Sequence, residues 1–313
     1  MGRVLFQELR LRGHEVYGCD LQHSAKPEVM RADVAERRQI ERVFREFGPL
    51  DLTLHLAAEF GRNNGQEFFE DLWRSNQIGT RNVIDLCIET ESRLLLAGSS
   101  EAYGESTVYV PHDSVPLAES SLDIYAPAHW NEYALSKYCQ ERQVFIAAST
   151  RGLRAAVLRL FNCYGYEYYT PYRSVVCLFI YRLMKGEPIT VYRNYHRVFQ
   201  WVGDFVKTVA NAVERFDALP RVDGFVGSRP GSVPVFNVGG REYLSVEEMK
   251  DKVVALLGGT DSNITYLDKE AANVTNKRPD ISLAERDLGH DPSTLLDEGL
   301  PITVDWMREV YGD

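Results

Sequence analysis

The chain has 313 residues, of which 44% are hydrophobic, and a formal net charge of −10 at pH 7. This length and apolar content suit one large or two modest globular domains, whereas the acidic balance argues against nucleic acid or an anionic membrane as a partner. The five cysteines are scattered, the opening residues are charged and no apolar run approaches membrane-spanning length, so we expect no redox dithiol, metal site or signal peptide and predict a cytoplasmic protein.

The first part of the chain alternates between helical and strand-like patterns. The opening "MGRVLFQELRLRGHEVYGCD" predicts a helix, a glycine break and a short strand that ends at Asp20. Strand-like runs follow in "LTLHLAA", "RLLLAGSS" and "RAAVLRLFN", separated by helical segments such as "RRQIERVFREFG" and "EDLWRSNQIGTRNVIDLCIE". This alternation predicts βαβ units, and therefore an α/β fold with a Rossmann-like, doubly wound parallel sheet.

The pattern changes after about residue 165. An aromatic loop, "YGYEYYTPYR", precedes a predicted helix in "SVVCLFIYRLMKG" and a short strand in "PITVY". A helix in "DFVKTVANAVERF", a strand in "VPVFNVGG" and a mainly helical tail follow. We therefore predict a cofactor domain and a smaller, interleaved C-terminal substrate lobe. The first covers residues 1–165 with return segments near 198–238, and the second covers 166–197 and 239–313.

Ligands of an open parallel sheet bind beyond the carboxyl ends of its strands. Several residues are candidates by this position alone: Asp20, Ala57, Ala58, Ser99, Ser100 and Asn162. The strongest chemical signal is "NEYALSK", where Tyr133 and Lys137 stand four apart and so share one face of a predicted helix. A lysine ammonium near a phenol lowers the phenol pKa, which lets the tyrosine exchange a proton with a substrate hydroxyl.

Tyr-x-x-x-Lys alone also suits a solvated helix face, but other motifs surround it. The segments "HLAAE", "NQIGTRN", "SSEAYG", "YALSK", "RLFNCYG" and "RPDISLAERDLGHDP" occur in this order. Together they resemble the extended short-chain dehydrogenase/reductase family, and within it the nucleotide-sugar epimerases and dehydratases, over nearly the whole chain. The resemblance implies a catalytic hydroxyl at Ser99, proton transfer by Tyr133, assistance from Lys137, and a bound NAD that takes a hydride from C4 of the sugar and later returns it.

The same resemblance implies a cofactor site at the carboxyl edge of the sheet. Its residues are Gly2, Asp20, Asp33, Val34, Leu56, Ala57, Ala58, Asn76 and Phe161, together with Tyr133 and Lys137. A carboxylate at Asp20 would accept hydrogen bonds from ribose hydroxyls and repel a 2′-phosphate, so we expect NAD rather than NADP. The alternative for Asp20 is a loop acid without a ligand.

Glu101 carries the expectation about the reaction. A 4-keto intermediate acidifies the C5 proton, and a nearby carboxylate can remove it. The order Ser99-Ser100-Glu101 resembles the nucleotide-sugar 4,6-dehydratases most, although uronate decarboxylases and some epimerases carry a similar pair. We therefore expect a lyase or isomerase of 4,6-dehydratase type with Glu101 as the C5 base. Ser100 is a poorer acid than the aspartic acid of related dehydratases, and Glu101 could also be a solvated strand-end acid.

The substrate side of the site rests on two arginines and two polar residues. Arg197 and Arg278 match family positions from which they could clamp a diphosphate, while Ser100 and Asn162 complete the expected set. Either arginine could instead be a surface ion-pair partner. The expected partner is a nucleotide-diphosphate sugar, without nucleic acid or membrane, and the family often forms homodimers through the helix that bears Tyr133.

The opening of the chain departs from the family pattern. Family members begin with a strand and a Gly-x-x-Gly-x-x-Gly turn, and Gly2 occupies the last glycine position. A missing central strand would leave its neighbours without ladder partners, so we expect that this chain starts late within the dinucleotide fold. The alternative of another class is a non-catalytic binding relative with an incomplete cofactor site.

Overall fold

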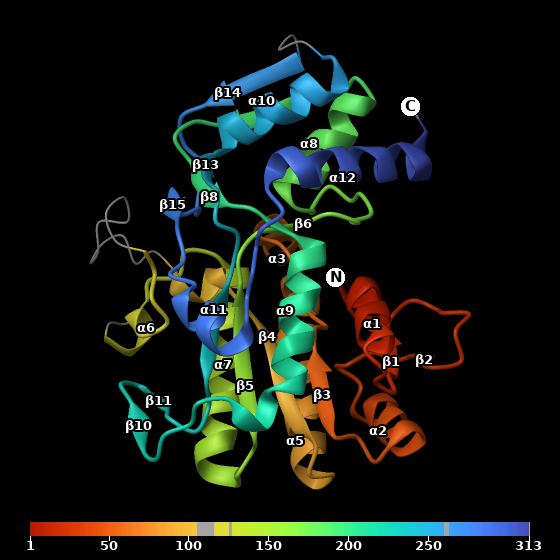
Figure 1. Ribbon diagram of the computed structural model, residues 1–313, viewed down its shortest axis with the longest axis vertical. Helices are drawn as coiled ribbons and strands as arrows, with labels where there is room; N and C mark the ends of the chain where they lie inside the picture. The colour runs from red at the N-terminus through yellow and green to blue at the C-terminus, as the bar shows by residue number, and fades with distance from the viewer. Residues whose placement is uncertain (105–115, 125–126, 260–262, 313) are drawn as a thin grey trace.

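The computed structural model describes residues 1–104, 116–124, 127–259 and 263–312 (Figure 1). Its central sheet has four parallel strands in the order β12-β5-β4-β3. These strands are β3 (Leu52–His55), β4 (Arg93–Ser99), β5 (Ala155–Leu160) and β12 (Val235–Val238). A separate parallel pair is formed by β1 (Gly18–Asp20) and β2 (Val29–Arg31). The predicted α/β class with a parallel sheet is confirmed.

Helices cover both faces of the central sheet. One face packs against α1 (Gly2–Leu11) and α9 (Val202–Glu214), and the other packs against α5 (Thr80–Glu89) and α7 (Glu132–Arg151). Successive side chains of a strand point to opposite faces. In β4, Leu95 accordingly joins the first core cluster, whereas Leu94 and Leu96 join the second. Burial on both faces explains the continuous apolar runs of these strands.

The helix between β3 and β4 is less regular than the sequence indicates. It consists of α4 (Phe69–Trp73), a π-helical stretch at Arg74–Gly79, and α5. Gly79 lies so close to the segment after β2 that a Cβ there would stand 2.6 Å from Val34 Cγ2. The π-helical stretch places Asn76 inside the molecule, against residues of the neighbouring loop and α7.

The C-terminal elements gather at the top of Figure 1. There, β7 (Ile189–Tyr192) pairs with β14 (Ile264–Leu267) in parallel, and β8 (His196–Val198) lies between two short strands, β13 (Tyr243–Ser245) and β15 (Asn276–Lys277). The tail predicted as mainly helical thus also contains β14 and β15. The larger helices of this region are α8 (Val175–Met184), α10 (Val246–Leu257) and α12 (Leu296–Tyr311).

The remaining described elements are short or peripheral. They are α2 (Arg37–Phe47), α3 (Arg62–Glu67), α6 (Ser121–Ile124), α11 (Ser282–Leu288), β6 (Cys163–Tyr164), β9 (Gln200–Trp201), β10 (Phe225–Val226) and β11 (Arg229–Pro230). The expected lobe boundaries stay a prediction, because one core cluster joins α1 and α9 to α8 and α12, and α11 lies against β12 and α9.

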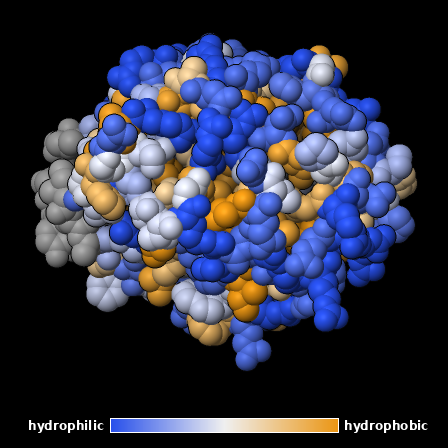
Figure 2. All heavy atoms as spheres, turned by 90° about the horizontal axis from the view of Figure 1, so that it is seen from below, coloured by the Kyte–Doolittle hydropathy of each residue, from blue (hydrophilic) through white to orange (hydrophobic). Residues whose placement is uncertain are grey.

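Two features of the outer parts complete the fold. Within the described residues, β1 pairs only with β2 and β3 pairs only with β4, so no ladder joins β1 to β3. The lower end of the molecule is mostly hydrophilic, with apolar residues in small separate areas (Figure 2). None of the described helices is both long and apolar enough to cross a bilayer.

Candidate active site

The turn after β4 presents the first two site residues. Ser99 ends the strand in extended conformation, and its Oγ accepts a hydrogen bond from the Glu101 backbone N–H at 3.2 Å. This bond caps a short 3-10 helix at Ser100–Tyr103. Gly104 then turns the chain with φ 58°, and a Cβ there would lie 2.5 Å from the Ala128 carbonyl oxygen. The turn therefore requires glycine and holds Ser99 and Glu101 in a fixed relation.

Helix α7 brings Tyr133 and Lys137 to the same place. Asn131 caps the helix by accepting a hydrogen bond from the Ala134 N–H at 2.8 Å, so its first turn begins just before Tyr133. The Tyr133 hydroxyl is hydrogen-bonded to the Ser99 side chain. Lys137 is buried, and its Nζ donates to the Ala97 carbonyl in β4 at 2.8 Å. Ser99, Tyr133 and Lys137 thus meet at the carboxyl end of β4.

The electrostatics of this triad differ from the expectation. Burial raises the pKa of Tyr133, the Glu101 carboxylate raises it further, and the Ser99 hydrogen bond only partly opposes them. Lys137 does not lower it in this structure, because its ammonium is directed at the Ala97 carbonyl. Burial also lowers the pKa of Lys137 to about 8, against the attraction of Glu141. Lys137 therefore loses its charge at a pH close to 8, well below the usual range for a lysine.

Glu101 has a partner that the sequence interpretation missed. Lys277 Nζ donates a hydrogen bond to Glu101 Oε1, and the Lys277 side chain is only 2% exposed. Burial would raise the pKa of Glu101, but Lys277, with help from Arg62 and Arg197, lowers it. Burial lowers the pKa of Lys277 to about 8, although Glu101 opposes this shift. Glu101 is therefore an ionised carboxylate in a cationic pocket.

Arg278 lies apart from Glu101. Lys277 ends β15, and Arg278 follows it directly. Adjacent residues of an extended chain point to opposite sides. Lys277 consequently points to Glu101, whereas Arg278 is exposed and lies over the Tyr243 ring, 5.7 Å from its centroid. Because side chains alternate along a strand, "NKRPD" read as a strand would place Lys277 and Arg278 on opposite sides. The sequence analysis did not predict the short strand β15.

Arg197 bonds to a neighbouring segment of the protein. Its buried guanidinium donates to the Thr275 carbonyl at 2.7 Å and to Asn273 Oδ1 at 3.0 Å, so it fastens the segment that leads to Lys277. The predicted diphosphate clamp of Arg197 with Arg278 stays a prediction. The cations around Glu101 are Lys277, Arg197 and Arg62, and Arg62 was not expected from the sequence.

Some expected cofactor residues line the carboxyl edge of the sheet. Ala57 and Ala58 are exposed just beyond β3, and a Cβ on Gly2 would lie 3.8 Å from Leu56 Cδ1. Asp20 ends β1 on the surface, where one carboxylate oxygen accepts from the Gln22 N–H at 2.9 Å. Small side chains after β3 and a carboxylate acceptor after β1 fit a dinucleotide, and the contact of Asp20 with ribose hydroxyls stays a prediction.

Other expected contact residues are buried. Asn76 is fully buried, because its side chain bonds both backbone groups of Glu59 and the Ser136 hydroxyl. Phe161 is also fully buried, and the Val34 carbonyl accepts from Asn82 Nδ2 at 2.9 Å. These three side chains are buried within the protein, and the contact of these residues with the cofactor stays a prediction.

The remaining expected residues are divided between the surface and the interior. Asp33 Oδ1 accepts from the Ala35 N–H at 2.8 Å and so shapes the loop after β2. Asn162 is exposed beyond β5, where its amide donates to the Val198 carbonyl at 3.1 Å. Ser100 is buried beside Glu101. Only Asn162 of these three lies open at the carboxyl edge of the sheet.

Comparison with known proteins agrees with this arrangement. The model of the "NAD dependent epimerase/dehydratase family" matches residues 1–239. A UDP-N-acetyl-alpha-D-glucosaminuronate decarboxylase of Bacillus cytotoxicus is 24% identical over all of this chain and 96% of the relative. UDP-glucuronic acid decarboxylase 1 of Xenopus tropicalis is 27% identical over 99% of this chain and 70% of the relative.

The fold is shared with solved structures of low sequence identity. The structure titled "MoeE5 in complex with UDP-glucuronic acid and NAD" superimposes with a TM-score of 0.80 at 22% identity, covering 99% of this chain and 96% of the other. The family match spans the whole parallel sheet with Ser99, Glu101, Tyr133 and Lys137, and the cofactor of this family is NAD. The chain belongs to the NAD-dependent epimerase/dehydratase family, within the nucleotide-sugar enzymes of the extended short-chain dehydrogenase/reductase group.

Proposed function

We propose that this chain decarboxylates a nucleotide-diphosphate uronic acid after NAD-dependent oxidation of its C4 hydroxyl. The 4,6-dehydratase reaction that the sequence favoured thereby becomes the second candidate. The observation that carries the change is the buried pair between Glu101 and Lys277. The names of the curated relatives, among them a UDP-N-acetylglucosaminuronate decarboxylase and a UDP-glucuronic acid decarboxylase, support the same choice.

The oxidation step assigns roles to three residues. Tyr133 removes the proton of the C4 hydroxyl, and Ser99 orients the C4 oxygen through its own hydroxyl. Lys137 stands one helical turn after Tyr133, and its charge favours the deprotonated tyrosine when the ammonium turns from the Ala97 carbonyl towards the phenol as cofactor and substrate bind. Bound NAD supplies the acceptor for the C4 hydride and afterwards the donor that returns it.

The resulting 4-keto sugar can react in ways that demand different groups. Dehydration needs a base for the C5 proton and an acid for the leaving C6 hydroxyl. Ser100 is a weak acid, and the pKa of Glu101 is lowered by Lys277 against the effect of burial, so Glu101 is a weak base. A 4-keto uronate is a β-keto acid, and its carboxylate leaves as CO2. This step needs no acid to protonate a leaving hydroxyl. Decarboxylation therefore suits these residues better.

The basic groups around Glu101 complete the proposed reaction. Lys277 and Arg197, with a smaller contribution from Arg62 because it is paired with Glu270 at 2.8 Å, offer positive charge to a substrate carboxylate on this side of the pocket. When the C5–C6 bond breaks, its electrons form an enolate, and Lys277 donates the proton that C5 then takes up. The hydride returns to C4 and Tyr133 returns its proton to the C4 oxygen, so the net change is loss of CO2 with uptake of one proton.

Mass spectrometry of products formed in deuterated water tests this proposal. The panel contains UDP-glucuronate, UDP-N-acetylglucosaminuronate, UDP-glucose and dTDP-glucose. We expect one uronate to lose the mass of CO2 and gain one deuterium at C5, while the hexoses are unchanged. Loss of water from a hexose would favour the 4,6-dehydratase instead, and a product that differs from its substrate only in configuration and in deuterium taken up at carbon would favour an epimerase.

The alternative of another class is tested with the same preparation. Acid treatment of the purified protein should release nicotinamide dinucleotide into the supernatant. A protein without bound NAD, which also fails to bind added NAD and converts none of the sugars, would be a non-catalytic binding relative.

A further inference from the structure

A polar row crosses the centre of the otherwise apolar sheet. Gly98 of β4 pairs with Arg159 of β5, and Arg159 pairs with Asn237 of β12. This row lies one residue before Ser99, the catalytic hydroxyl proposed above. Arg159 is only 1% exposed, and a guanidinium is rarely buried unless it is paired. The cost of burying this charge requires a specific set of partners.

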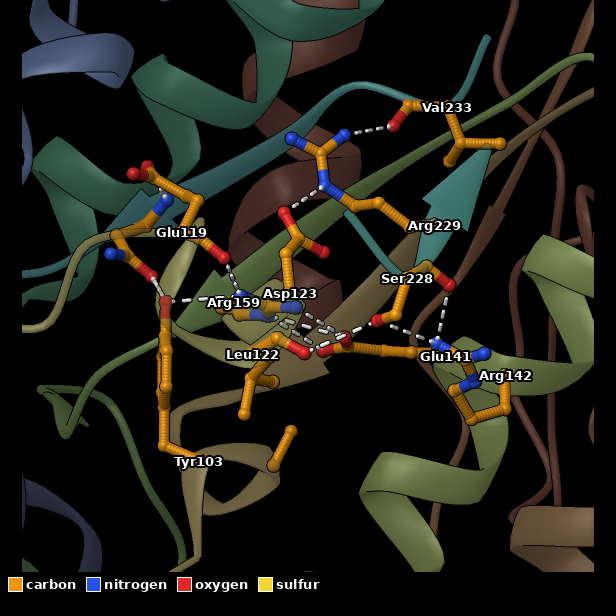
Figure 3. A network of polar contacts seen from close by, with 12 residues as sticks. Tyr103, Glu119, Leu122, Asp123, Glu141, Arg142, Arg159, Ser228, Arg229 and Val233 are labelled. Atoms are coloured by element: carbon orange, nitrogen blue, oxygen red, sulfur yellow. Dashed lines mark hydrogen bonds and ion pairs between the residues drawn. The ribbon is translucent and has the colours of Figure 1, made fainter. Parts of the chain in front are cut away.

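The partners of Arg159 come from three different segments (Figure 3). Its Nε and Nη2 donate to the Glu141 carboxylate, with the shortest contact at 2.9 Å. Its Nη1 donates to the Tyr103 hydroxyl and to the Glu119 carbonyl, both at 3.0 Å. Gly98 makes room for this pair, because a Cβ there would stand 2.9 Å from Glu141 Oε1.

The network continues from Tyr103 into the C-terminal segment. The Tyr103 hydroxyl donates to Asn237 Oδ1 at 2.7 Å. The Asn237 amide in turn donates to the Leu117 carbonyl at 2.8 Å and to the Asp280 carbonyl at 3.0 Å. Asp280 stands three residues after Lys277. The polar row therefore connects the sheet with the segment that delivers Lys277 to Glu101.

Each segment held by the network carries a group of the active site. Glu141 follows Lys137 by four residues and Tyr133 by eight, so all three share one face of α7. Tyr103 ends the 3-10 helix that contains Glu101. We propose that the Arg159–Glu141 ion pair is a positioning unit, which fixes Tyr133 and Lys137 relative to Ser99 and Glu101.

The test removes both charges together, since a single substitution leaves an unpaired buried charge and destabilises the fold. The variant Arg159→Met with Glu141→Leu keeps apolar volume in place of the pair. We expect kcat to fall by about 100-fold, because small displacements of reacting groups are costly, while KM and the melting temperature stay close to those of the wild type. The kinetic readout rests on the proposed function.

Hydrogen exchange provides a readout that needs no substrate. Amides of residues 98–104, including the Gly104 N–H bonded to the Glu101 carbonyl at 3.0 Å, should exchange faster in the double variant. The matched control is Arg229→Met with Asp123→Leu. This pair is nearly as buried, at 12% and 6% side-chain exposure, and appears in Figure 3, but it joins β11 to α6. We expect wild-type exchange and wild-type kcat for the control.

The outcomes separate this inference from the proposed function. Unchanged exchange at residues 98–104 and an unchanged kcat in the double variant would overturn the positioning role. Faster exchange with a wild type that converts no uronate would overturn the proposed function and leave the positioning role in place. If the double variant does not fold, Arg159→Lys replaces it. This variant keeps the charge but loses the planar fork, and it must show the same two changes.

Discussion

At the scale of single residues, the decisive feature is the choice between two neighbouring cations. The sequence analysis assigned Arg278 to a diphosphate and assigned no role to Lys277, whereas the structure places Lys277 on Glu101 and Arg278 over the Tyr243 ring. A short strand decides this, because consecutive side chains alternate in direction. The chemistry of the pocket follows from the inward residue, which keeps Glu101 ionised.

Substitution of Lys277 tests this assignment. In Lys277→Met, burial of Glu101 is no longer offset by its closest cation, so the pKa of Glu101 rises. Activity should fall by about 100-fold or more, as for loss of a general acid, and the acidic limb of the kcat/KM profile should move to higher pH. Arg278→Met is the matched control, and a larger loss in this control than in Lys277→Met would contradict the assignment.

His55 offers a prediction about stability at acid pH. Burial, with a smaller contribution from the charge of Lys137, lowers its pKa to about 3, while its Nε2 is hydrogen-bonded to the Thr80 hydroxyl at 2.9 Å. The unfolded chain binds a proton at this residue below its ordinary pKa of about 6.5, whereas the folded chain does not until about 3. Between these values, falling pH therefore favours the unfolded state.

The magnitude follows from proton linkage. His55 should remove about 1.4 kcal/mol of stability per pH unit below its unfolded pKa. Urea unfolding at pH 7 and pH 5 measures this loss in the wild type and in His55→Asn. We expect a smaller loss between the two pH values in the variant. Equal losses would mean that His55 is not held neutral by the fold.

At the scale of elements, the sequence predicted the regular parts well and the short parts poorly. The runs around β4, β5 and β12 are recognisable because burial on both faces makes them mainly apolar, and the half-buried β3 is recognisable from its leucines. Helix α7 was recognisable from its Tyr-x-x-x-Lys spacing. By contrast, β15 has two residues, and its position depends on pairing with the distant strand β8. No local pattern encodes such a partner.

The same limit applies to the candidate site. Ser99, Glu101, Tyr133 and Lys137 lie in motifs whose spacing is visible along the chain. Lys277 and Arg62 come near Glu101 only through tertiary packing. Alternation along "NKRPD" separates Lys277 from Arg278 once the strand is known, but it does not indicate that Glu101 is the partner. Asn76 and Phe161 lie in visible motifs, but their burial could not be predicted from them. A motif position does not reveal whether a side chain faces the ligand or the core.

The turn after β4 can be tested through Gly104. An alanine there would be strained at φ 58°, and its Cβ would lie 2.5 Å from the Ala128 carbonyl oxygen. Gly152 is the matched control, because it has φ 72° at the end of α7 but no atom within 4 Å of an added Cβ. Gly152→Ala should lower the free energy of unfolding by about 1 kcal/mol, and Gly104→Ala by about 1–3 kcal/mol more. Urea titration measures both, and equal losses would mean that the Ala128 contact relaxes without cost.

At the scale of the whole molecule, one core supports both the sheet and the C-terminal elements. The cluster that contains Leu5 and Leu9 of α1 continues through α9 to α8 and α12. Substrate-side elements therefore rest on the helices that cover one face of the sheet. Relative movement of the two parts would expose this shared apolar surface, so we expect them to unfold together.

We propose that the interface of the expected homodimer lies on the opposite face of the sheet. Leu135 and Ile146 are 40% and 59% exposed, and they stand eleven residues apart on α7, which is about three helical turns. They therefore share one side of this helix, and Ile78 of the adjoining π-helical stretch is 49% exposed. The lower end of the molecule offers only small separate apolar areas (Figure 2), so the long side of α7 is the better candidate.

Light scattering after size exclusion tests this surface. The net charge of −10 makes two copies repel each other, and burial of Leu135 and Ile146 in both copies has to outweigh that repulsion. We expect the mass of a dimer for the wild type and of a monomer for Leu135→Glu with Ile146→Glu, because four buried carboxylates would be unpaired.

Leu11→Glu is the control, since Leu11 is 85% exposed at the end of α1 on another side of the molecule. It should keep the dimer, and a wild type that stays monomeric at high concentration would contradict the interface. Because α7 also carries Tyr133 and Lys137, such an interface would brace the helix that places them.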